Sequence, residues 1–384
     1  MKLRDLTNAR ERRIRIEQEA RTSLQHVGSF TFEESIVSKR NCENLIGAMQ
    51  VPLGIAGPLQ IKNEKRKSKN YYIPLATTEG ALVASVNRGC KAITDAGGAS
   101  GYAYRIGTTR GPVFYTKSIV EDQRLYTWIT EHTKRLSEVA EETSRHLKVL
   151  QIEISGATPY IFLRIYFDTE DAMGMNMATI ATEKMVEFIE KETGVACLSV
   201  AGNFDVDKKP SWLNVINKRG WQAGADIVLS QDVVSSVLKT TPEKFFKTWL
   251  AKCMVGSALS GSLGFNSHMA NVLAAIFIAT GQDPAHVVEG SCGLTTAEVL
   301  DSGSLRVSVY LPALMIGTVG GGTNLATQKE ALSILGVSGD GNVHEFAEIV
   351  AGAVLAGEIS LLASLSEGSL TRAHQKLARA QQQL

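Results

Sequence analysis

The hydrophobic and polar positions of the first hundred residues predict a charged helix, a loop, and a strand that leads into a second helix. Residues 5–25 combine helical composition with many charges, which is typical of a solvated or packing helix. Glycine and proline crowd residues 47–58, which predicts an ordered but irregular loop, and the charged residues 62–70 predict a hairpin-like turn. The sequence YYIPLATT predicts a strand, and we expect a helix to begin near Glu79 and to continue toward Ile93.

The middle of the chain follows the order strand, helix, strand, strand, helix, strand. Period-two alternation predicts the strands, and apolar residues three or four apart predict the helices. The six segments are 113–119, 121–147, 150–155, 160–167, 173–193 and 195–200. This order is typical of a ferredoxin-like fold, and it predicts a small inserted domain at residues 112–199.

The remaining elements predict an α+β protein with a large mixed helix and sheet domain. That domain comprises residues 46–111 and 200–384, and residues 1–45 form an N-terminal helical segment. The strongly apolar run Ala270–Ala279 is too short to cross a bilayer, so it predicts a buried helix.

Composition narrows the class of protein. The chain has 384 residues, of which 44% are hydrophobic and 21% charged, which is ordinary for a globular protein. Forty basic and thirty-nine acidic residues give a net charge of +1, which argues against a protein that mainly binds nucleic-acid backbone. The charged N-terminus has no apolar core and does not resemble a signal peptide, so we expect a soluble, intracellular protein.

Several familiar sites are missing from the sequence. Its five cysteines form no CxxC pair, which indicates neither a disulfide framework nor a cysteine zinc site. The sequence contains no GxGxxG, no GxxxxGK[ST], no GxSxG and no HExxH. We therefore expect no metal ion and no standard Rossmann fingerprint.

Three segments carry charged side chains that could line a catalytic cleft. Glu79 follows a strand, Lys208 and Lys209 lie on a polar loop that begins at Gly202, and Asp283 follows the apolar helix. Lysines can hold an anion or polarise a carbonyl group, and a carboxyl group can transfer a proton. The structural alternative is that the two acids cap or end helices and that the lysines belong to a solvated turn.

The other patterns are rich in glycine or contain histidine. Residues 171–176 and 317–324 could bring backbone amides close to a dinucleotide, although glycine also makes tight turns. His268 and Asn271 lie three residues apart on one helical face. His374 lies near the end of the chain, where a lone histidine is more often incidental than catalytic.

Taken together and in this order, the motifs resemble those of the hydroxymethylglutaryl-coenzyme A reductase family over nearly the whole chain. The matching segments are ENLIG, PLGIAGP, PLATTEGALVAS, RIGTTRGPV, DAMGMNM, GNFDVDKKP, GTVGGGTNLATQ and AGEISLLASL. IAGP resembles the class shared by archaea and eukaryotes, without the membrane domain of the eukaryotic forms. The resemblance implies a cytoplasmic homodimer and leaves open its further assembly into a dimer of dimers. It also implies reduction of (S)-3-hydroxy-3-methylglutaryl-coenzyme A (HMG-CoA) to mevalonate and coenzyme A with two NADPH, the committed step toward isoprenoids.

The resemblance implies four catalytic residues. Glu79 would donate a proton, and Lys208 would stabilise the developing oxyanion. Asp283 would hold the network of Glu79 and Lys208 and tune its pKa values, because an ordinary glutamate, with a pKa of about 4.3, is a poor acid at neutral pH. His374 would protonate the departing thiolate.

The resemblance also implies three groups of binding residues. Those for the hydroxymethylglutaryl group would be Arg110, Asn203, Asp207, Lys209, Lys252, His268 and Asn271, and those for coenzyme A would be Ser85, Asn87 and Arg88. Those for NADPH would be Asp171, Met173, Gly174, Met175 and Asn176 of the small domain and Val319, Gly320 and Thr323 of the large one. Ser144 and Arg145 would meet the 2′-phosphate, which favours NADPH over NADH.

Three positions depart from the family pattern. Ala201 replaces a serine, and near the catalytic histidine Ala373 replaces a serine and Gly368-Ser369 replaces the usual Gly-His. After His374, only Arg379 of the family's terminal pattern stands at its expected place. Two other functions stay open on the residues alone. One is an RNA-recognition module in the insert, although no RNP1-like stretch is present. The other is a coenzyme A-dependent transferase or thioesterase without hydride chemistry.

Overall fold

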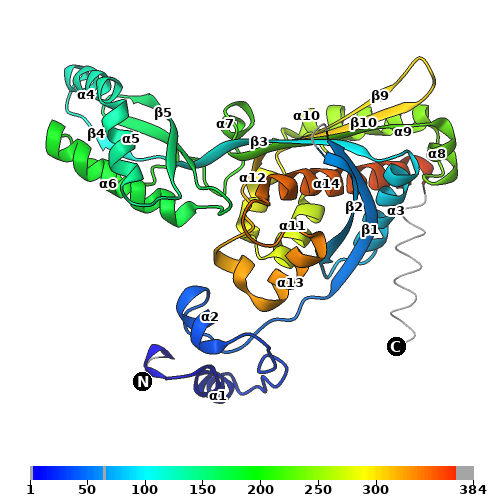
Figure 1. Ribbon diagram of the computed structural model, residues 1–384, viewed down its shortest axis with the longest axis horizontal. Helices are drawn as coiled ribbons and strands as arrows, with labels where there is room; N and C mark the ends of the chain where they lie inside the picture. The colour runs from blue at the N-terminus through cyan, green and yellow to red at the C-terminus, as the bar shows by residue number, and fades with distance from the viewer. Residues whose placement is uncertain (1–2, 64–65, 369–384) are drawn as a thin grey trace.

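The computed structural model describes residues 3–63 and 66–368, which form a mixed α+β fold (Figure 1). At the N-terminus, α1 (Ala9–Ala20) and α2 (Glu34–Arg40) pack around a small apolar cluster that contains Val37 and Leu45. The first helix begins after Asn8, whose side chain accepts a hydrogen bond from the Glu11 amide. The helix predicted within residues 5–25 is α1.

A large sheet forms the centre of the molecule. Its strands are β1 (Leu53–Asn63), β2 (Arg66–Ala76), β3 (Ala99–Arg110), β8 (Gly220–Leu229), β9 (Leu294–Val299) and β10 (Leu305–Leu314). The strands β3, β8, β10 and β9 are neighbours in that order and antiparallel, and β1 pairs with β2 in a hairpin and with the start of β3.

The irregular loop predicted for residues 47–58 is wrong from Leu53 onward, because β1 begins there. The register of β1 on β2 shifts between Ala56 and Leu59, and this bulge accommodates Gly57 and Pro58 without ending the strand. Gly57 has φ +133°, a conformation that glycine adopts without strain.

Two apolar helices pack in the main core. They are α11 (Met269–Thr280) and α14 (Val343–Glu367), and α3 (Leu82–Asp95) crosses α14 so closely that a Cβ atom on Gly89 would stand 1.9 Å from the Ala356 carbonyl oxygen. By length and composition α14 could cross a membrane, but most of its apolar stretch is buried within the fold. Its composition therefore reflects its place in the core.

The other helices of the large unit connect and cover these elements. They are α7 (Trp212–Ile216), α8 (Gln231–Ser236), α9 (Pro242–Trp249), a π-helical segment (Leu250–Gly256), α10 (Ser257–Ser260), α12 (Val287–Gly290) and α13 (Ala326–Leu335), with short 3₁₀ turns at Leu3–Asp5, Pro284–His286 and Gly321–Asn324.

The elements from β4 to β7 form a second unit with its own hydrophobic core. Its elements are β4 (Val113–Tyr115), α4 (Ile119–Glu131), α5 (Thr133–Glu141), β5 (Lys148–Ala157), β6 (Tyr160–Asp168), α6 (Met175–Thr193) and β7 (Cys197–Ser199). The strands lie in the antiparallel order β7-β4-β6-β5, with the helices α4, α5 and α6 on one end of the molecule (Figure 1). The domain boundaries at residues 112 and 199 stay a prediction.

The single helix predicted over residues 121–147 is wrong, because the chain breaks at His132 and leaves the second helix after Glu141. The His132 ring stacks on Trp128, and its Nδ1 lies 2.7 Å from the Trp128 carbonyl oxygen. This local contact competes with the continuing helical bond pattern. The strand β3 joins the two units, since Ser100–Gly107 pair with β8 and Thr108–Arg110 pair with β6.

Candidate active site

A strained loop after β7 carries the predicted lysines. Asn203, Val206 and Lys208 have φ values of +66°, +52° and +55°, although none of them is glycine. Each such conformation costs roughly 1–3 kcal/mol and persists only where its surroundings enforce it. Left-handed backbone at three positions of one short loop is typical of a functional site.

Buried polar side chains hold this loop in place. Arg164, which is fully buried, donates hydrogen bonds to the Phe204 carbonyl oxygen at 3.1 Å and to Asn214 Oδ1 at 2.9 Å. Asn214 Nδ2 donates in turn to the Val206 carbonyl oxygen at 3.0 Å, and the Thr109 hydroxyl donates to the Asp205 carbonyl oxygen at 2.9 Å. The strain in the loop is therefore balanced by bonds to both units of the chain.

Lys208 forms a partly exposed ion pair with Asp283. Lys208 Nζ lies 2.7 Å from Asp283 Oδ2, and the Ala285 amide donates to Asp283 Oδ1 at 3.0 Å. Burial by itself would raise the pKa of Asp283, but the bonds from Lys208 and Ala285 and the nearby His286 hold this pKa below its ordinary value. Both side chains are partly exposed, so a ligand could reach them.

Glu79 lies in a turn before α3, which begins at Leu82 and not near Glu79 as predicted. The Ala81 residue before the helix has φ +72°, and this turn keeps Glu79 outside the first helical turn. Asn271 Nδ2 donates to Glu79 Oε1 at 3.3 Å. Within the described part of the chain, Glu79 and Lys208 form no direct ion pair, and the Glu79 carboxylate instead contacts Asn271 on α11.

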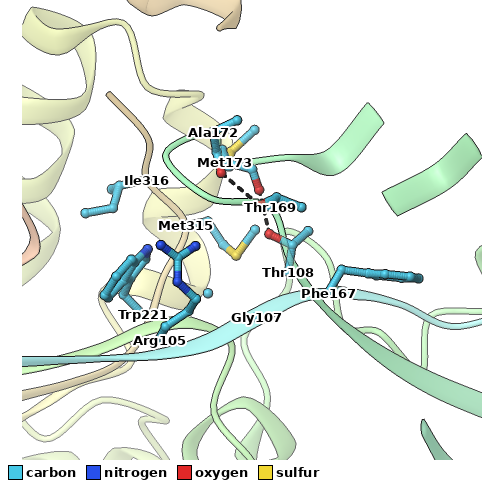
Figure 2. A pocket seen from close by; sticks show the side chains of 11 residues that line it. Arg105, Gly107, Thr108, Phe167, Thr169, Ala172, Met173, Trp221, Met315 and Ile316 are labelled. Atoms are coloured by element: carbon cyan, nitrogen blue, oxygen red, sulfur yellow. Dashed lines mark hydrogen bonds between the residues drawn. The ribbon is translucent and has the colours of Figure 1, made fainter. Parts of the chain in front are cut away.

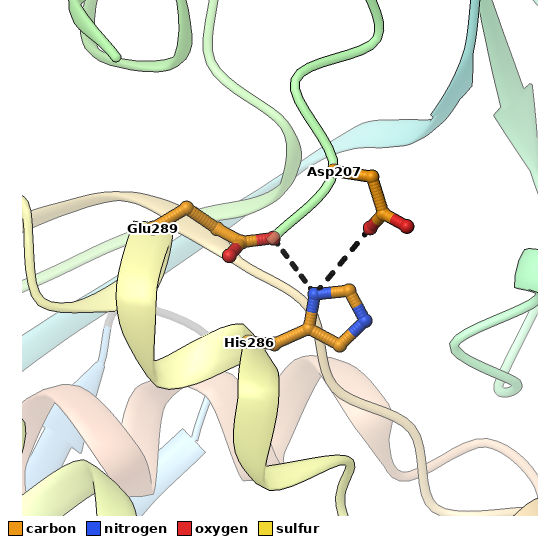
Figure 3. Close-up of side chains that lie close together, drawn as sticks. All are labelled: Asp207, His286 and Glu289. Carbon is orange, nitrogen blue, oxygen red and sulfur yellow. Dashed lines mark hydrogen bonds and ion pairs between the residues drawn. The ribbon is translucent and has the colours of Figure 1, made fainter. Parts of the chain in front are cut away.

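Four side chains, which we call the buried charge cluster, gather at the lysine loop. They are Asp207, Arg219, His286 and Glu289. Figure 3 shows Asp207, His286 and Glu289 of this cluster. Arg219 donates to Asp207 Oδ1 at 2.8 Å and to Glu289 Oε1 at 2.6 Å, and His286 Nδ1 lies 2.7 Å from the same Glu289 oxygen. The Lys208 amide also donates to Glu289 Oε1, at 3.3 Å. The cluster thus connects the loop to the helix that follows Asp283.

Electrostatics inside the cluster favour ionised Asp207. Burial by itself would raise the pKa of Asp207, but the charges of Arg219, His286 and Arg110 outweigh burial and hold the pKa below its ordinary value. Asp207, His286 and Glu289 offer oxygen and nitrogen atoms of the kind that bind metals. The Arg219 guanidinium contacts both carboxylates, so a cationic side chain already pairs with these oxygens.

Sequence reasoning missed Arg219, His286 and Glu289. No motif includes Arg219, and the one signal for the other two is their spacing of three residues, which suits one face of a helical turn. Among the predicted residues, the structure brings Asp207, Lys208 and Asp283 together around this cluster. Arg110 joins them, with its Nη1 3.8 Å from Asp207 Oδ2 and 3.2 Å from Asp205 Oδ2.

An open pocket of about 790 Å³ lies beside the lysine loop. Its lining includes three predicted substrate residues, Lys252, His268 and Asn271, together with Pro210 at the end of the loop. The backbone around His268 is fixed by the buried Glu358, whose carboxylate accepts the amide hydrogens of Ser267 and His268 at 2.7 Å each. A pocket of this size matches a ligand larger than a simple sugar or amino acid.

The predicted coenzyme A residues on α3 contact other parts of the chain. The Ser85 hydroxyl donates to Ser360 Oγ at 3.0 Å, and Arg88 Nη2 donates to the Ser360 carbonyl oxygen at 2.5 Å. Asn87 Oδ1 accepts from the Gly57 amide at 2.9 Å. Burial against α14 lowers the pKa of Arg88. These contacts fix the side chains on α3 before any ligand arrives.

The two glycine-rich segments lie side by side. Ala172 and Val319 form a parallel bridge, and the Thr318 amide donates to the Asp171 carbonyl oxygen at 2.8 Å. The Asp171 carboxylate accepts the amide hydrogens of Gly341, Asn342 and Val343 at 2.8, 3.1 and 3.0 Å, so it caps the start of α14. Asp171 therefore holds the small unit against the large one.

The remaining predicted NADPH residues surround the start of α6. Gly174 precedes the helix with φ +81°, and no side chain caps the first amides, among them those of Met175 and Asn176. On the large unit, Gly320 is exposed with φ +78°, and the Thr323 hydroxyl donates to its carbonyl oxygen at 2.7 Å.

Arg145 is exposed and connected to this region through neighbouring side chains. Its Nε donates to His146 Nε2 at 2.9 Å, and His146 Nδ1 lies 2.6 Å from Glu170 Oε2, next to Asp171. Ser144 Oγ lies 3.8 Å from the sulfur of Met177 in the first turn of α6.

A cavity of only about 10 Å³ lies where β3 passes between the units (Figure 2). The Arg105 guanidinium stacks 4.6 Å from the Trp221 ring, and the Thr108 hydroxyl donates to the Met173 carbonyl oxygen at 2.5 Å. The space suits about one water molecule. It is a joint between the units and not a ligand site. His374, Ala373 and Arg379 lie outside the described residues.

Comparison with known proteins identifies relatives along nearly the whole chain. The sequence model of the family described as hydroxymethylglutaryl-coenzyme A reductase matches residues 8–379. The 3-hydroxy-3-methylglutaryl-coenzyme A reductase of Methanothermobacter thermautotrophicus is 50% identical over 371 residues, which cover 96% of this chain and 93% of the relative. The enzyme of the same name from Methanocaldococcus jannaschii is 51% identical, with 96% of this chain and 92% of the relative covered.

Solved structures share the fold. The class II 3-hydroxy-3-methylglutaryl-CoA reductase from Streptococcus pneumoniae bound to NADPH aligns with a TM-score of 0.68 at 18% identity, over 94% of this chain and 97% of that protein. The α+β fold expected from the sequence is therefore confirmed.

Proposed function

The chain belongs to the hydroxymethylglutaryl-coenzyme A reductase family, and we propose that Glu79, Lys208 and Asp283 carry out its reaction. The reaction reduces HMG-CoA with two NADPH to mevalonate and coenzyme A. The observation that carries this assignment is the 2.7 Å ion pair between Lys208 and Asp283 beside the open pocket, on a loop whose strain is enforced by buried side chains.

The chemistry of the site follows from its charges. The Lys208 ammonium group, at the partly exposed end of its ion pair, stabilises the negative charge that develops on the carbonyl oxygen. Asp283 orients that ammonium group and stays ionised, because its pKa is held low. Glu79, oriented by Asn271, donates the proton to the reduced oxygen.

His374 completes the proposed site from the C-terminal segment. The first reduction produces a hemithioacetal whose collapse releases a thiolate, and a thiol has an unperturbed pKa of about 8.5. An imidazolium group is suited to protonate that thiolate at neutral pH, which prevents its return to the aldehyde. We assign this step to His374 on the resemblance of the sequence alone.

The residues near α6 fit a dinucleotide. When bound, NADPH supplies the hydride. The amides at the start of α6 have no side-chain cap, and a helix start of this kind favours phosphate groups. Exposed Arg145 offers a guanidinium fork to a 2′-phosphate, while Met173 and Gly320 form adjoining parts of the two glycine-rich segments. The small unit thus binds the cofactor, and the large unit binds HMG-CoA.

A change at Arg145 tests this cofactor assignment. Arg145→Ala is expected to weaken NADPH binding about tenfold or more, because a hydrogen bond to a charged group contributes roughly 1.5–3 kcal/mol. NADH binding should change little, since NADH lacks the 2′-phosphate. Dissociation constants for both nucleotides provide the measurement. Arg135→Ala, which removes another exposed arginine of the small unit, is the control, and equal losses for the two nucleotides contradict the assignment.

The substrate carboxylate is assigned to Arg110, Lys209 and Lys252, with Asn203 and Asp207 nearby, and the coenzyme A portion to the α3 residues around Arg88. We further assign a homodimer in the cytoplasm. Met49 and Leu259 are 84% and 85% exposed, and in the proposed homodimer the partner chain would cover these apolar side chains. Met49 lies two residues after the ENLIG segment, and Leu259 lies on α10 beside the open pocket.

The reaction itself is tested with the purified chain, HMG-CoA and NADPH. We expect the oxidation of two NADPH for each coenzyme A released. The absorbance of NADPH measures its oxidation. Release of coenzyme A without oxidation of NADPH would instead indicate a transferase or thioesterase, and the absence of both would reject the proposed function.

A further inference from the structure

His286 is a buried histidine that the mechanism above does not use. Its side chain has no exposed surface, and three carboxylates lie near it, those of Asp207 and Glu289 (Figure 3) and that of Asp283. Nδ1 lies 2.7 Å from Glu289 Oε1 and 3.8 Å from Asp207 Oδ1, and Nε2 lies 3.9 Å from Asp283 Oδ2. Nε2 is buried and makes no hydrogen bond to any residue that the structure describes. A buried polar atom of this kind calls for an explanation.

The contacts of the two ring nitrogens determine which form of the ring fits. A neutral imidazole carries one N–H, so one lone pair would face either Glu289 or Asp283. Two acceptors facing each other in a buried site repel, and an unpaired buried polar atom costs free energy. The doubly protonated ring donates toward Glu289 with Nδ1 and faces Asp283 with the Nε2 hydrogen.

The surrounding charges agree with this form. Three carboxylates lie near the ring, and two cationic side chains, Lys208 and Arg219, contact them. Arg110 is left out of this count because it lies closer to Asp205, which is also left out. A protonated ring makes the numbers of negative and positive charges equal. The groups in this count are Asp207, Asp283, Glu289, Arg219, Lys208 and His286.

We propose that His286 is a positioning residue whose protonated ring holds Asp283 when Lys208 turns toward the substrate oxygen. In the structure the Lys208 ammonium group lies 2.7 Å from Asp283, so an ammonium group that serves the oxyanion partly leaves that carboxylate. The ring supplies Asp283 with a second cation from the buried side. This inference rests on the roles proposed above for Lys208 and Asp283.

Glu289 makes the arrangement rigid. Its Oε1 contacts His286 Nδ1 at 2.7 Å and accepts the Lys208 amide hydrogen at 3.3 Å. One fixed carboxylate oxygen therefore sets both the ring that faces Asp283 and the backbone that carries the Lys208 side chain. A shift of about 1 Å in such a site can reduce turnover about a hundredfold.

Two substitutions separate the charge of His286 from its hydrogen bonds. His286→Gln places an amide nitrogen near the position of Nε2, toward Asp283, and His286→Asn places one near Nδ1, toward Glu289. We expect kcat near neutral pH to fall at least about tenfold in the Gln variant and further in the Asn variant, with KM for HMG-CoA changed less than about threefold. His132→Gln is the control, because Nδ1 of His132 also has an acceptor at 2.7 Å, in the small unit.

The pH dependence distinguishes a charged ring from a space-filling one. If the charge of the ring is what supports Asp283, the ratio of wild-type kcat to that of the Gln variant should shrink as pH rises, because only the wild-type side chain can lose a proton. A ratio that stays constant with pH, together with equal effects of the two variants, would overturn the proposal.

A measurement on the wild-type enzyme covers the case in which the variants do not fold. Nitrogen-15 NMR of histidine-labelled protein should show both nitrogens of the His286 ring protonated at neutral pH. The His286 signal is identified as the one whose chemical shift changes in the Asp283→Asn variant. A neutral ring in an active enzyme rejects this inference alone. An enzyme without NADPH-dependent reduction, or one that stays active as Lys208→Ala, rejects the proposed function instead.

Discussion

Lys208→Ala is expected to abolish turnover of HMG-CoA while leaving substrate binding largely intact. A donor that stabilises an oxyanion contributes about 2.7–4 kcal/mol, which corresponds to about 10²–10³ in kcat. The same ammonium group faces the carbonyl oxygen in both reductions, so reduction of added mevaldehyde should fall as well. The left-handed backbone at residue 208, with φ +55°, is as costly for alanine as for lysine, because both carry a Cβ atom. The substitution therefore removes the charge without changing the strain of the loop.

The measurement compares kcat and KM for HMG-CoA and for mevaldehyde. Lys184→Ala is the matched control, since Lys184 also forms a 2.8 Å ion pair, with Glu187, but lies exposed on the outer helix α6. The control should keep wild-type kinetics. Near-normal turnover by Lys208→Ala would mean that this lysine only belongs to a solvated turn.

The sequence predicted the elements that have a clear periodicity of hydrophobic residues. It missed those that depend on contacts between distant residues or on a specific side-chain contact. The helix at Met269–Thr280 is apolar on nearly all sides and was predicted almost to the residue. By contrast, β1 contains Gly57 and Pro58, which locally favour a loop, and pairing with β2 around a bulge overrides that preference. The contact of His132 with Trp128 likewise ends α4, and no period in the sequence indicates it.

For the candidate site, the motifs gave residue identities but not their partners. Lys208 and Asp283 were named from the resemblance, and only the fold shows them 2.7 Å apart. Arg219 belongs to no motif, because a buried counter-ion needs a position in space and no particular spacing in sequence. Asp171 shows the converse, since a residue assigned to the cofactor also caps α14 through three backbone amides. A residue that belongs to a family motif can therefore have a structural role as well as the functional one assigned to it.

Arg219→Met is expected to lower the free energy of unfolding by about 3–5 kcal/mol. The Arg219 side chain has no exposed surface, and its guanidinium donates to Asp207, Glu289 and Thr109 at 2.8, 2.6 and 2.7 Å. Methionine fills much of the same volume, but it leaves the buried Glu289 and the partly buried Asp207 without the Arg219 cation. Breaking a buried ion pair by removing one partner costs about this amount, because the remaining charge is uncompensated. Denaturant unfolding followed by fluorescence or circular dichroism measures the loss.

The dependence of that loss on pH identifies its origin. Arg219 holds the pKa of Asp207 below its ordinary value, so ionised Asp207 contributes stability that is complete above its unfolded pKa of about 4. That contribution disappears as pH falls through the lower pKa of the folded state. The difference between wild type and Arg219→Met should therefore be largest above about pH 4 and shrink at lower pH, where the carboxyl groups are neutral in both proteins. Arg306→Met removes an exposed arginine 2.9 Å from Glu298 and should cost less than about 1 kcal/mol. A loss in Arg219→Met that did not vary with pH would instead point to packing around the methionine.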